Sequence, residues 1–181
     1  MAVLGCGEED EFAGSPDPAT ERSDPPAKPP PGWRTFANRR TGFTVSVPPG
    51  WSVRVRRSAT LIRSPDRLVA VTIAADRSEP ARTMPPREYA RRTFRALPGF
   101  RRLKAAAARP VEHSPYPSAR VHGTGTLADT RQRQRITVAA FRRARRVTYT
   151  MVAFSADLRR AVHARKLKLL RASLRGRRPA L

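Results

Sequence analysis

The chain has 181 residues and carries a formal net charge of +23, from 37 Lys and Arg residues against 14 Asp and Glu residues. This length allows one domain with a tail. The single cysteine excludes an internal disulfide. No stretch approaches the roughly 18–20 apolar residues of a membrane-spanning helix.

The charge is divided unevenly along the chain. Residues 1–32 hold seven acids and two bases, for a net charge of −5, so the remainder carries +28. Seven of the 18 prolines also lie in residues 1–32. We therefore expect an acidic, proline-rich segment that does not collapse, followed by a strongly basic globular part. A field of this size attracts anionic lipids, wall polymers or nucleic acid without specifying which.

The cysteine lies in a context that resembles a bacterial lipobox, Val3-Leu4-Gly5-Cys6-Gly7. Such a cysteine receives a diacylglyceryl group, and residues 7–32 would then serve as the tether to the domain. A secretory leader needs a basic segment and about 7–15 apolar residues before its cleavage site. We therefore expect the rest of the leader upstream of Met1, with Cys6 anchoring the protein at the extracytoplasmic face of the cell membrane. The alternative is a cytosolic protein with a free thiol in its tail.

A strand and a turn stand out between Gly42 and Trp51. Apolar side chains alternate with polar ones over 43–47, which predicts a strand with one buried face. Pro48 and Pro49 end the strand, and Pro49-Gly50 suits a type II turn whose second central residue has positive φ. We expect the ring of Trp51 in the core. Strands are also predicted over 33–37, 52–56, 59–63 and 68–74, with 33–37 pairing with 43–47 as a hairpin.

The rest of the chain predicts a helix, a meander and a second helix. We expect a loop over 79–86, a helix over 87–97 with Tyr89 and Phe94 in the core, and a β-like or irregular stretch over 102–112. Strands follow over 116–127, 134–141 and 147–154, the first weakened by Gly123 and Gly125. Ser155 is predicted to cap a final helix over 157–175. Its expected core stripe is Leu158, Ala161, Val162, Leu169 and Ala172, widened by Leu167, Leu170 and Leu174.

Short links between these strands favour an α+β fold, an antiparallel sheet flanked by helices. The order of elements is similar to the PsbP-like α/β/α sandwich. The residues that carry this resemblance are Gly42, Phe43, Val45, Val47, Pro48, Gly50 and Trp51. The resemblance covers roughly Trp33–Arg175, and it implies a non-catalytic binding or assembly module of the kind found in a Ran-binding protein and in small actinobacterial envelope lipoproteins. We place the domain at 33–178, after the anchor and tether of 1–32 and before a short tail at 179–181.

The sequence gives no support for catalysis, a metal or a cofactor. His113, His122 and His163 lack partners at metal-ligand spacing, apart from Glu112 beside His113, and we expect them at the surface or in loops. No serine has a nucleophile-elbow motif, and no glycine-rich phosphate loop is present. We therefore expect neither a catalytic residue nor a cofactor.

Binding of an anionic partner is the remaining hypothesis. Basic clusters occur at Arg54–Arg57, at the predicted turn 142–146, and along the outer face of the last helix. The predicted contact residues are Arg142, Arg143, Arg145, Arg146, Arg159, Arg160, Arg165, Lys166, Lys168 and Arg171. The expected partner is anionic lipid, a wall polymer or an envelope protein. The alternative is a soluble basic module that binds nucleic acid or an acidic protein, although the aromatic residues interleave poorly with the basic ones.

Overall fold

The computed structural model describes residues 29–144, 146–156 and 160–176. Within them the chain forms two antiparallel sheets and three helices. In chain order the elements are β1 (Arg34–Asn38), β2 (Phe43–Val47), β3 (Ser52–Val55), β4 (Ala59–Arg63), β5 (Val69–Asp76), α1 (Glu79–Thr83), α2 (Pro86–Arg95), β6 (Phe100–Ala105), β7 (Ser118–Leu127), β8 (Arg133–Arg143), β9 (Val147–Ala156), α3 (Arg160–Ala172) and β10 (Arg175–Gly176).

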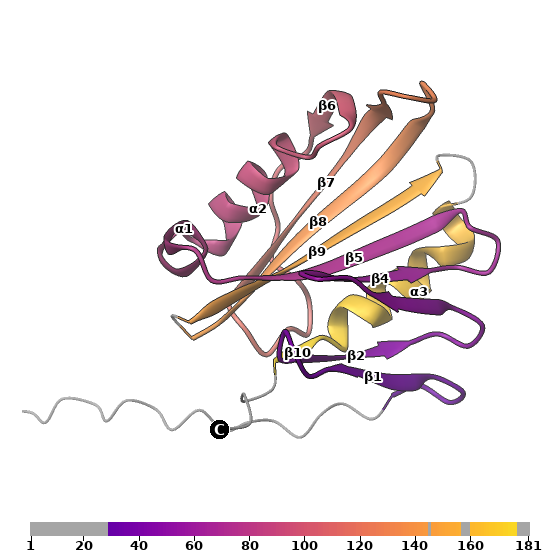
Figure 1. Ribbon diagram of the computed structural model, residues 1–181. Coiled ribbons are helices and arrows are strands. Elements are labelled where there is room, and N and C mark those ends of the chain that lie inside the picture. The colour runs from indigo at the N-terminus through magenta and orange to yellow at the C-terminus, as the bar shows by residue number, and fades with distance from the viewer. Residues whose placement is uncertain (1–28, 145, 157–159, 177–181) are drawn as a thin grey trace, which may run out of the picture.

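The larger sheet has the strand order β3-β4-β5-β9-β8-β7-β6. The predicted strands over 59–63 and 68–74 are present as β4 and β5, which pair antiparallel with Thr60 opposite Ile73. The apolar strand β9 lies in the middle, where both of its faces are covered. Helices α1 and α2 cover one face, while α3 and the smaller sheet lie on the other (Figure 1). The expected α+β class with helices on both sides of a sheet is therefore confirmed.

The smaller sheet has the order β1-β2-β10 and contains the predicted hairpin, in which Phe36 lies opposite Val45. A single sheet was expected, and the structure instead divides the strands between two. The division falls at the predicted turn, where Gly50 has φ +75° and the N–H of Trp51 donates to the carbonyl of Pro48 at 3.3 Å. Because the prolines stop β2, the chain crosses there to the edge of the larger sheet.

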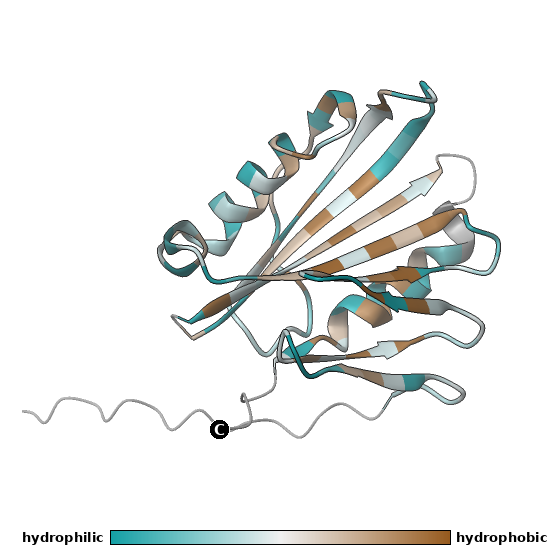
Figure 2. Cartoon of the chain, in the orientation of Figure 1, coloured by the Kyte–Doolittle hydropathy of each residue, from teal (hydrophilic) through white to brown (hydrophobic). Residues whose placement is uncertain are grey.

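Each face of the larger sheet has its own apolar core. One core joins β2 and α3 to the sheet and contains Phe43 and Trp51, of which Trp51 is only 2% exposed. The other lies under α2 and contains Tyr89 and Phe94. These four core predictions are confirmed. Figure 2 shows the corresponding brown bands along the strands and a largely teal α2.

Several local predictions were wrong. The expected loop contains α1, because Pro80 is tolerated in the first turn of a helix. Strand β9 continues to Ala156, so Ser155 lies in the sheet and does not cap a helix. Helix α3 ends at Ala172, because Arg175–Gly176 pairs with β2 as a short strand.

The core stripe of α3 also differs from the prediction. Of the predicted stripe, Leu170 and, just beyond the helix, Leu174 are buried, whereas Leu169 and Ala172 are only half-buried. His163 and Arg171 are buried as well and were not predicted to be. Leucines occur on more than one side of this helix, so the sequence did not determine which side packs.

Some predictions concern residues outside the described ranges. They include the anchor and tether of 1–28 with Cys6, the tail at 179–181, and the contact residues Arg145 and Arg159. Among the described helices, none has the length and apolar character that crossing a bilayer requires.

Candidate anion-binding site

The predicted basic residues do not share one surface. Arg142 and Arg143 lie at the end of β8 and are half-buried, with Arg143 packed over Gly176 and near the Tyr149 hydroxyl. Arg146 is exposed in the turn that follows. This cluster therefore closes one end of the larger sheet.

The basic residues of α3 are divided between solvent and the interior. Arg165 and Lys168 are exposed, and Lys166 is half-buried. Arg171 was expected on the outer face and is instead 8% exposed. Arg160 belongs to the helix, but its side chain lies outside the part of the chain that the structure describes. Anion binding by this set stays a prediction.

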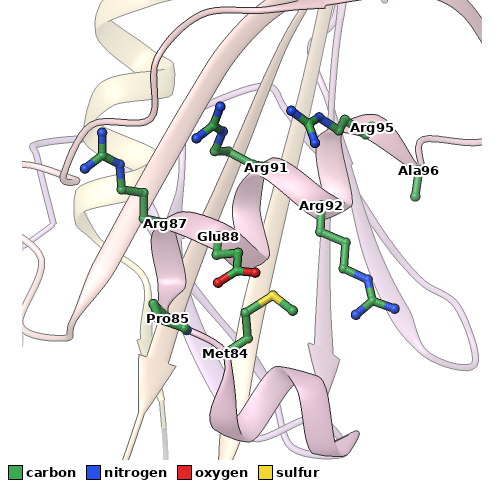
Figure 3. A pocket seen from close by; sticks show the side chains of 8 residues that line it. All are labelled: Met84, Pro85, Arg87, Glu88, Arg91, Arg92, Arg95 and Ala96. Carbon is green, nitrogen blue, oxygen red and sulfur yellow. The ribbon is translucent and has the colours of Figure 1, made fainter.

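A more regular group of cations lies on α2. Its apolar residues Tyr89, Ala90 and Phe94 face the sheet, and an exposed flank carries Arg87, Arg91 and Arg95 at four-residue spacing. We call these three residues the arginine row. All three are exposed, and they project along the same side of the helix (Figure 3). The row was not predicted, although the repeat of Arg at i, i+4 and i+8 in the predicted helix indicates that the three side chains share one side.

The arginine row makes no ion pair with a carboxylate of the described residues, although Glu88 lines the same hollow. Nearby Asp76 accepts a hydrogen bond from the Tyr89 hydroxyl at 2.6 Å. Burial raises the pKa of Asp76, but the hydrogen bonds from Tyr89 and the N–H of Ser78 outweigh it and hold that pKa below its usual value. Asp76 is therefore an anion that binds the Tyr89 hydroxyl and not a member of the arginine row.

The surface around the row is open and weakly apolar. A hollow of about 890 Å³ is lined by the row together with Met84, Pro85, Glu88, Arg92 and Ala96. Among the described residues, the exposed large apolar side chain is Val55, on the far edge strand β3. The α2 surface therefore offers charge and hydrogen-bond donors, and no large side chain that could insert into a bilayer.

The histidines behave differently from one another. His113 is exposed as expected, and His122 is half-buried with Nδ1 2.8 Å from the Thr137 hydroxyl. His163 was expected at the surface and is 4% exposed, with Nε2 2.7 Å from Asp66 Oδ2 and its ring edge-on to Trp51. Across the described ranges, no three His, Cys, Asp or Glu side chains group in a way that could hold a metal ion.

The central antiparallel sheet, with α1 and α2 on one face and α3 with the smaller sheet on the other, defines an α+β domain. No protein-family model matches the chain, and no curated protein matches its sequence. Similarity appears among solved structures. The PsbP protein of Synechocystis sp. PCC 6803 (CyanoP) is 11% identical with a TM-score of 0.62, over 80% of this chain and 92% of that one.

The Saccharomyces cerevisiae Ran-binding protein Mog1p is 11% identical with a TM-score of 0.57, over 80% of this chain and 95% of its own. A Bacteroides thetaiotaomicron protein reaches a TM-score of 0.56 at 11% identity, over 81% of this chain and 49% of its own. At such identities the likeness establishes the fold alone. The fold is PsbP-like, as the resemblance over Gly42–Trp51 predicted.

Proposed function

We propose that this chain is a non-catalytic binding domain of the cell envelope, which is lipid-anchored through Cys6 and presents α2 to anionic phospholipid headgroups. The arginine row is the observation that carries the proposal. Three like charges at four-residue spacing destabilise a helix, so their presence without an ion-pair partner among the described residues favours an external anion. The fold is also compatible with a binding role, since Mog1p is named as a Ran-binding protein.

Phospholipid is favoured over single-stranded nucleic acid by the distribution of aromatic rings. Binding of single strands relies on exposed aromatic side chains on which bases stack. In the described residues every aromatic side chain is buried or half-buried. For a domain anchored at a membrane, headgroups are the nearest dense negative surface.

The test is co-sedimentation of the full chain with vesicles of phosphatidylglycerol and phosphatidylcholine. Cys6→Ser is included in every variant, so that binding reports on the domain and not on a lipid. Each basic residue near such a surface contributes about 1 kcal/mol. We therefore expect the triple change of Arg87, Arg91 and Arg95 to Gln to weaken binding roughly 100-fold at low salt. Because no large apolar group inserts, about 1 M salt should abolish binding.

The matched control removes three other exposed arginines, Arg54, Arg56 and Arg57, beside the opposite edge of the larger sheet. Both triple variants lose the same net charge. Equal weakening by both would show that only total charge matters, and stronger binding to a single-stranded oligonucleotide would favour the nucleic-acid alternative. The anchor is tested by mass spectrometry of the membrane-extracted native protein, where an unmodified Cys6 peptide would refute lipidation.

A further inference from the structure

The larger sheet has two edge strands, β3 and β6, and they differ in regularity. The register of β6 with β7 shifts between Arg101 and Lys104, and Arg102 has φ 52°. Such a bulge twists an edge strand away from further pairing. Strand β3 instead pairs with β4 in one unbroken register along Ser52–Val55. The outer side of β3, which we call the β3 edge, therefore keeps the geometry of a strand that can pair again.

Backbone groups of two valines are directed at the β3 edge. The N–H of Arg56 donates to the carbonyl of Ala59 at 2.7 Å, which makes these residues a hydrogen-bonded pair at the hairpin. Hydrogen-bonded and non-hydrogen-bonded pairs alternate along an antiparallel ladder. Arg54 therefore bonds to β4, whereas the N–H and C=O groups of Val53 and Val55 point away from it. Among the described strands, β4 is the one that pairs with β3.

The side chains of β3 alternate between an apolar and a basic side. Val53 packs half-buried against the core on the α3 side of the sheet, and Val55 on the same side is 54% exposed. Arg54 and, by continued alternation, Arg56 extend from the other side, and Arg57 follows in the hairpin loop. All three arginines are exposed, and none forms an ion pair with a carboxylate of the described residues. The β3 edge therefore combines an exposed apolar side chain with three positive charges.

We propose that the β3 edge binds an extended acidic segment of a partner protein, which adds a strand to the larger sheet. In such β-strand addition, main-chain hydrogen bonds supply affinity, and alternate side chains supply specificity. Carboxylates opposite Arg54 and Arg56, and apolar side chains opposite Val53 and Val55, would each stabilise the pairing. The same arginines would repel a basic segment. The segment that fits is therefore one in which acidic and apolar residues alternate.

The charges of the β3 edge favour a partner protein over the chain itself. Antiparallel self-pairing of β3 centred on Arg54 or on Val55 would set arginines directly opposite one another, which is unfavourable. The chain's own acidic run, Glu8–Glu11, is consecutive and does not alternate with apolar residues. The β3 edge is also separate from the arginine row, because α2 packs over β6, β7 and β8 at the other end of the strand order (Figure 1).

The test is titration of the full chain carrying Cys6→Ser with a synthetic heptapeptide, Glu-Val-Glu-Val-Glu-Val-Glu, blocked at both ends. Calorimetry at low salt should show saturable binding of one peptide per chain. Hydrogen exchange locates the contact, since the amides of Val53 and Val55 have no strand partner among the described residues. At 100 times the Kd, their exchange should slow about 100-fold, while the exchange of the β6 amides should be unchanged.

Two peptides with the same number of carboxylates serve as comparators. The first keeps the composition but groups the residues as Val-Val-Val-Glu-Glu-Glu-Glu, so that acidic and apolar side chains no longer alternate. The second replaces each valine with proline, which has no N–H to donate to the carbonyls of Val53 and Val55. Because each comparator keeps the charge but loses part of the strand pairing, both should bind about 10-fold more weakly, or weaker still.

Variants of the chain test the same contact from the protein side. In Val55→Pro the lost N–H points away from β4, so the substitution removes a donor from the β3 edge without removing a bond of the sheet. It should weaken peptide binding by about 10-fold or more. The triple change of Arg54, Arg56 and Arg57 to Gln should weaken binding about 3- to 100-fold. The triple variant of the arginine row loses the same net charge and should bind the peptide as the parent chain does.

Thermal unfolding shows first that each variant is folded, and if Val55→Pro is not, the arginine triple and the amide exchange decide. Weaker binding by the β3 variants, with slowed exchange of Val53 and Val55, supports the proposal whatever the vesicles show. No saturable binding, equal binding of either comparator, or an equal loss in the arginine-row triple would overturn it. So would tighter binding of single-stranded oligothymidine at the β3 arginines. Exchange of Val53 and Val55 that is already slow in the free chain, and quickens when Glu8–Glu11 is neutralised by amide substitutions, would equally overturn the choice of partner.

Discussion

Asp66 and His163 join parts of the chain that are 97 positions apart. An ionised carboxylate only accepts hydrogen bonds, so Nε2 of His163 is the donor. Asp66 also accepts from the Ser64 hydroxyl and from the N–H of Leu68 at 3.1 Å. The pair ties the β4–β5 turn to the buried side of α3, beside Trp51.

Asp66→Asn should therefore destabilise the fold in a pH-dependent way. Hydrogen bonds from Ser64, then from His163, and then from the N–H of Leu68 hold the pKa of Asp66 well below its usual value. A carboxyl with a lowered folded-state pKa stabilises the fold above its unfolded pKa of about 3.9, and this contribution is lost as pH falls below that value. We expect a lower Tm than wild type at pH 7 and a difference that shrinks from about pH 4 downward.

The control for this measurement is Asp129→Asn. Asp129 is exposed in the β7–β8 turn and accepts a hydrogen bond from the adjacent N–H of Thr130. Thermal unfolding from pH 7 to pH 2 should therefore show little change for this variant. A pH-independent loss in Asp66→Asn would contradict the assigned role of the ionised carboxylate.

Of the two buried rings at this contact, the sequence predicted the burial of Trp51 but not that of His163. A large ring after an apolar strand is usually buried, and Trp51 is. The burial of His163 was missed, because its partner lies in a distant turn that only the docking of α3 brings near. Gly123 is similar: the carbonyl of Lys104 and the Phe94 ring occupy the space that a Cβ would need there. Gly123 is therefore needed for close packing, whereas the sequence indicates only that a glycine weakens the strand.

At the scale of elements, α2 carries like charges where opposite charges would stabilise it. The arginine row places positive groups one turn apart, with Arg92 on the adjoining side. Such pairs cost a few tenths of a kcal/mol each in an exposed helix. Retaining them is consistent with a binding role whose partner supplies the missing negative charge.

Arg91→Glu should therefore stabilise the domain and weaken vesicle binding at once. The new carboxylate would lie four residues from both Arg87 and Arg95, so two repulsive pairs become attractive, while the pair with Glu88 three residues earlier becomes repulsive. We expect a net gain of about 0.5–1 kcal/mol in the free energy of unfolding, measured by urea titration. Arg91→Gln, which removes the repulsion without adding attraction, should give a smaller gain.

Opposite effects on stability and binding would mark the row as functional. A variant that became more stable while binding phosphatidylglycerol vesicles as tightly as before would show that the row is not the contact surface. A destabilised Arg91→Glu would show instead that Arg91 makes a structural contribution.

Elements whose formation depends mainly on their own residues were predicted from the sequence. Alternation identified the principal strands, and apolar spacing identified α2. Helix α1 was not predicted, because it has only five residues and contains Pro80, although a proline in the first turn of a helix is tolerated. Strand β10 has two residues and exists only because Arg175 and Gly176 meet β2. The burial of His163 and Arg171 on α3 also depends on tertiary packing, since periodicity shows which residues share a face but not where a helix will dock.

At the scale of the whole molecule, the smaller sheet shares an apolar core with the larger one, and three of the hydrogen bonds that join it to the rest are buried or half-buried. The Tyr149 hydroxyl on β9 donates to the carbonyl of Gly42 at 2.6 Å, and Asn38 on β1 donates to the Thr60 hydroxyl at 2.8 Å. The N–H of Ser46 donates to the Ser173 hydroxyl at 2.9 Å, which joins β2 to the end of α3. The chain passes from one sheet to the other at the Gly50 turn, and these contacts hold the two sheets together.

Tyr149→Phe should loosen the smaller sheet selectively. The Tyr149 ring is 1% exposed and packs edge-on against Phe43, so removing the hydroxyl deprives the Gly42 carbonyl of this donor in a dry site. Burial raises the pKa of Tyr149 despite the nearby charge of Arg143, so the hydroxyl keeps its proton at neutral pH. We expect a loss of about 1–3 kcal/mol, read from hydrogen exchange of the β2 amides.

Tyr89→Phe is the matched control, since it removes a hydroxyl that bonds Asp76 at the same distance but within the larger sheet and α2. Both variants should lower the Tm. Only Tyr149→Phe should lower the protection of the β2 amides beyond its effect on β5 and β9. If both tyrosine variants lowered β2 protection equally, the sheets would open as a single unit. The Gly42 contact would then contribute to global stability without specifically docking the smaller sheet.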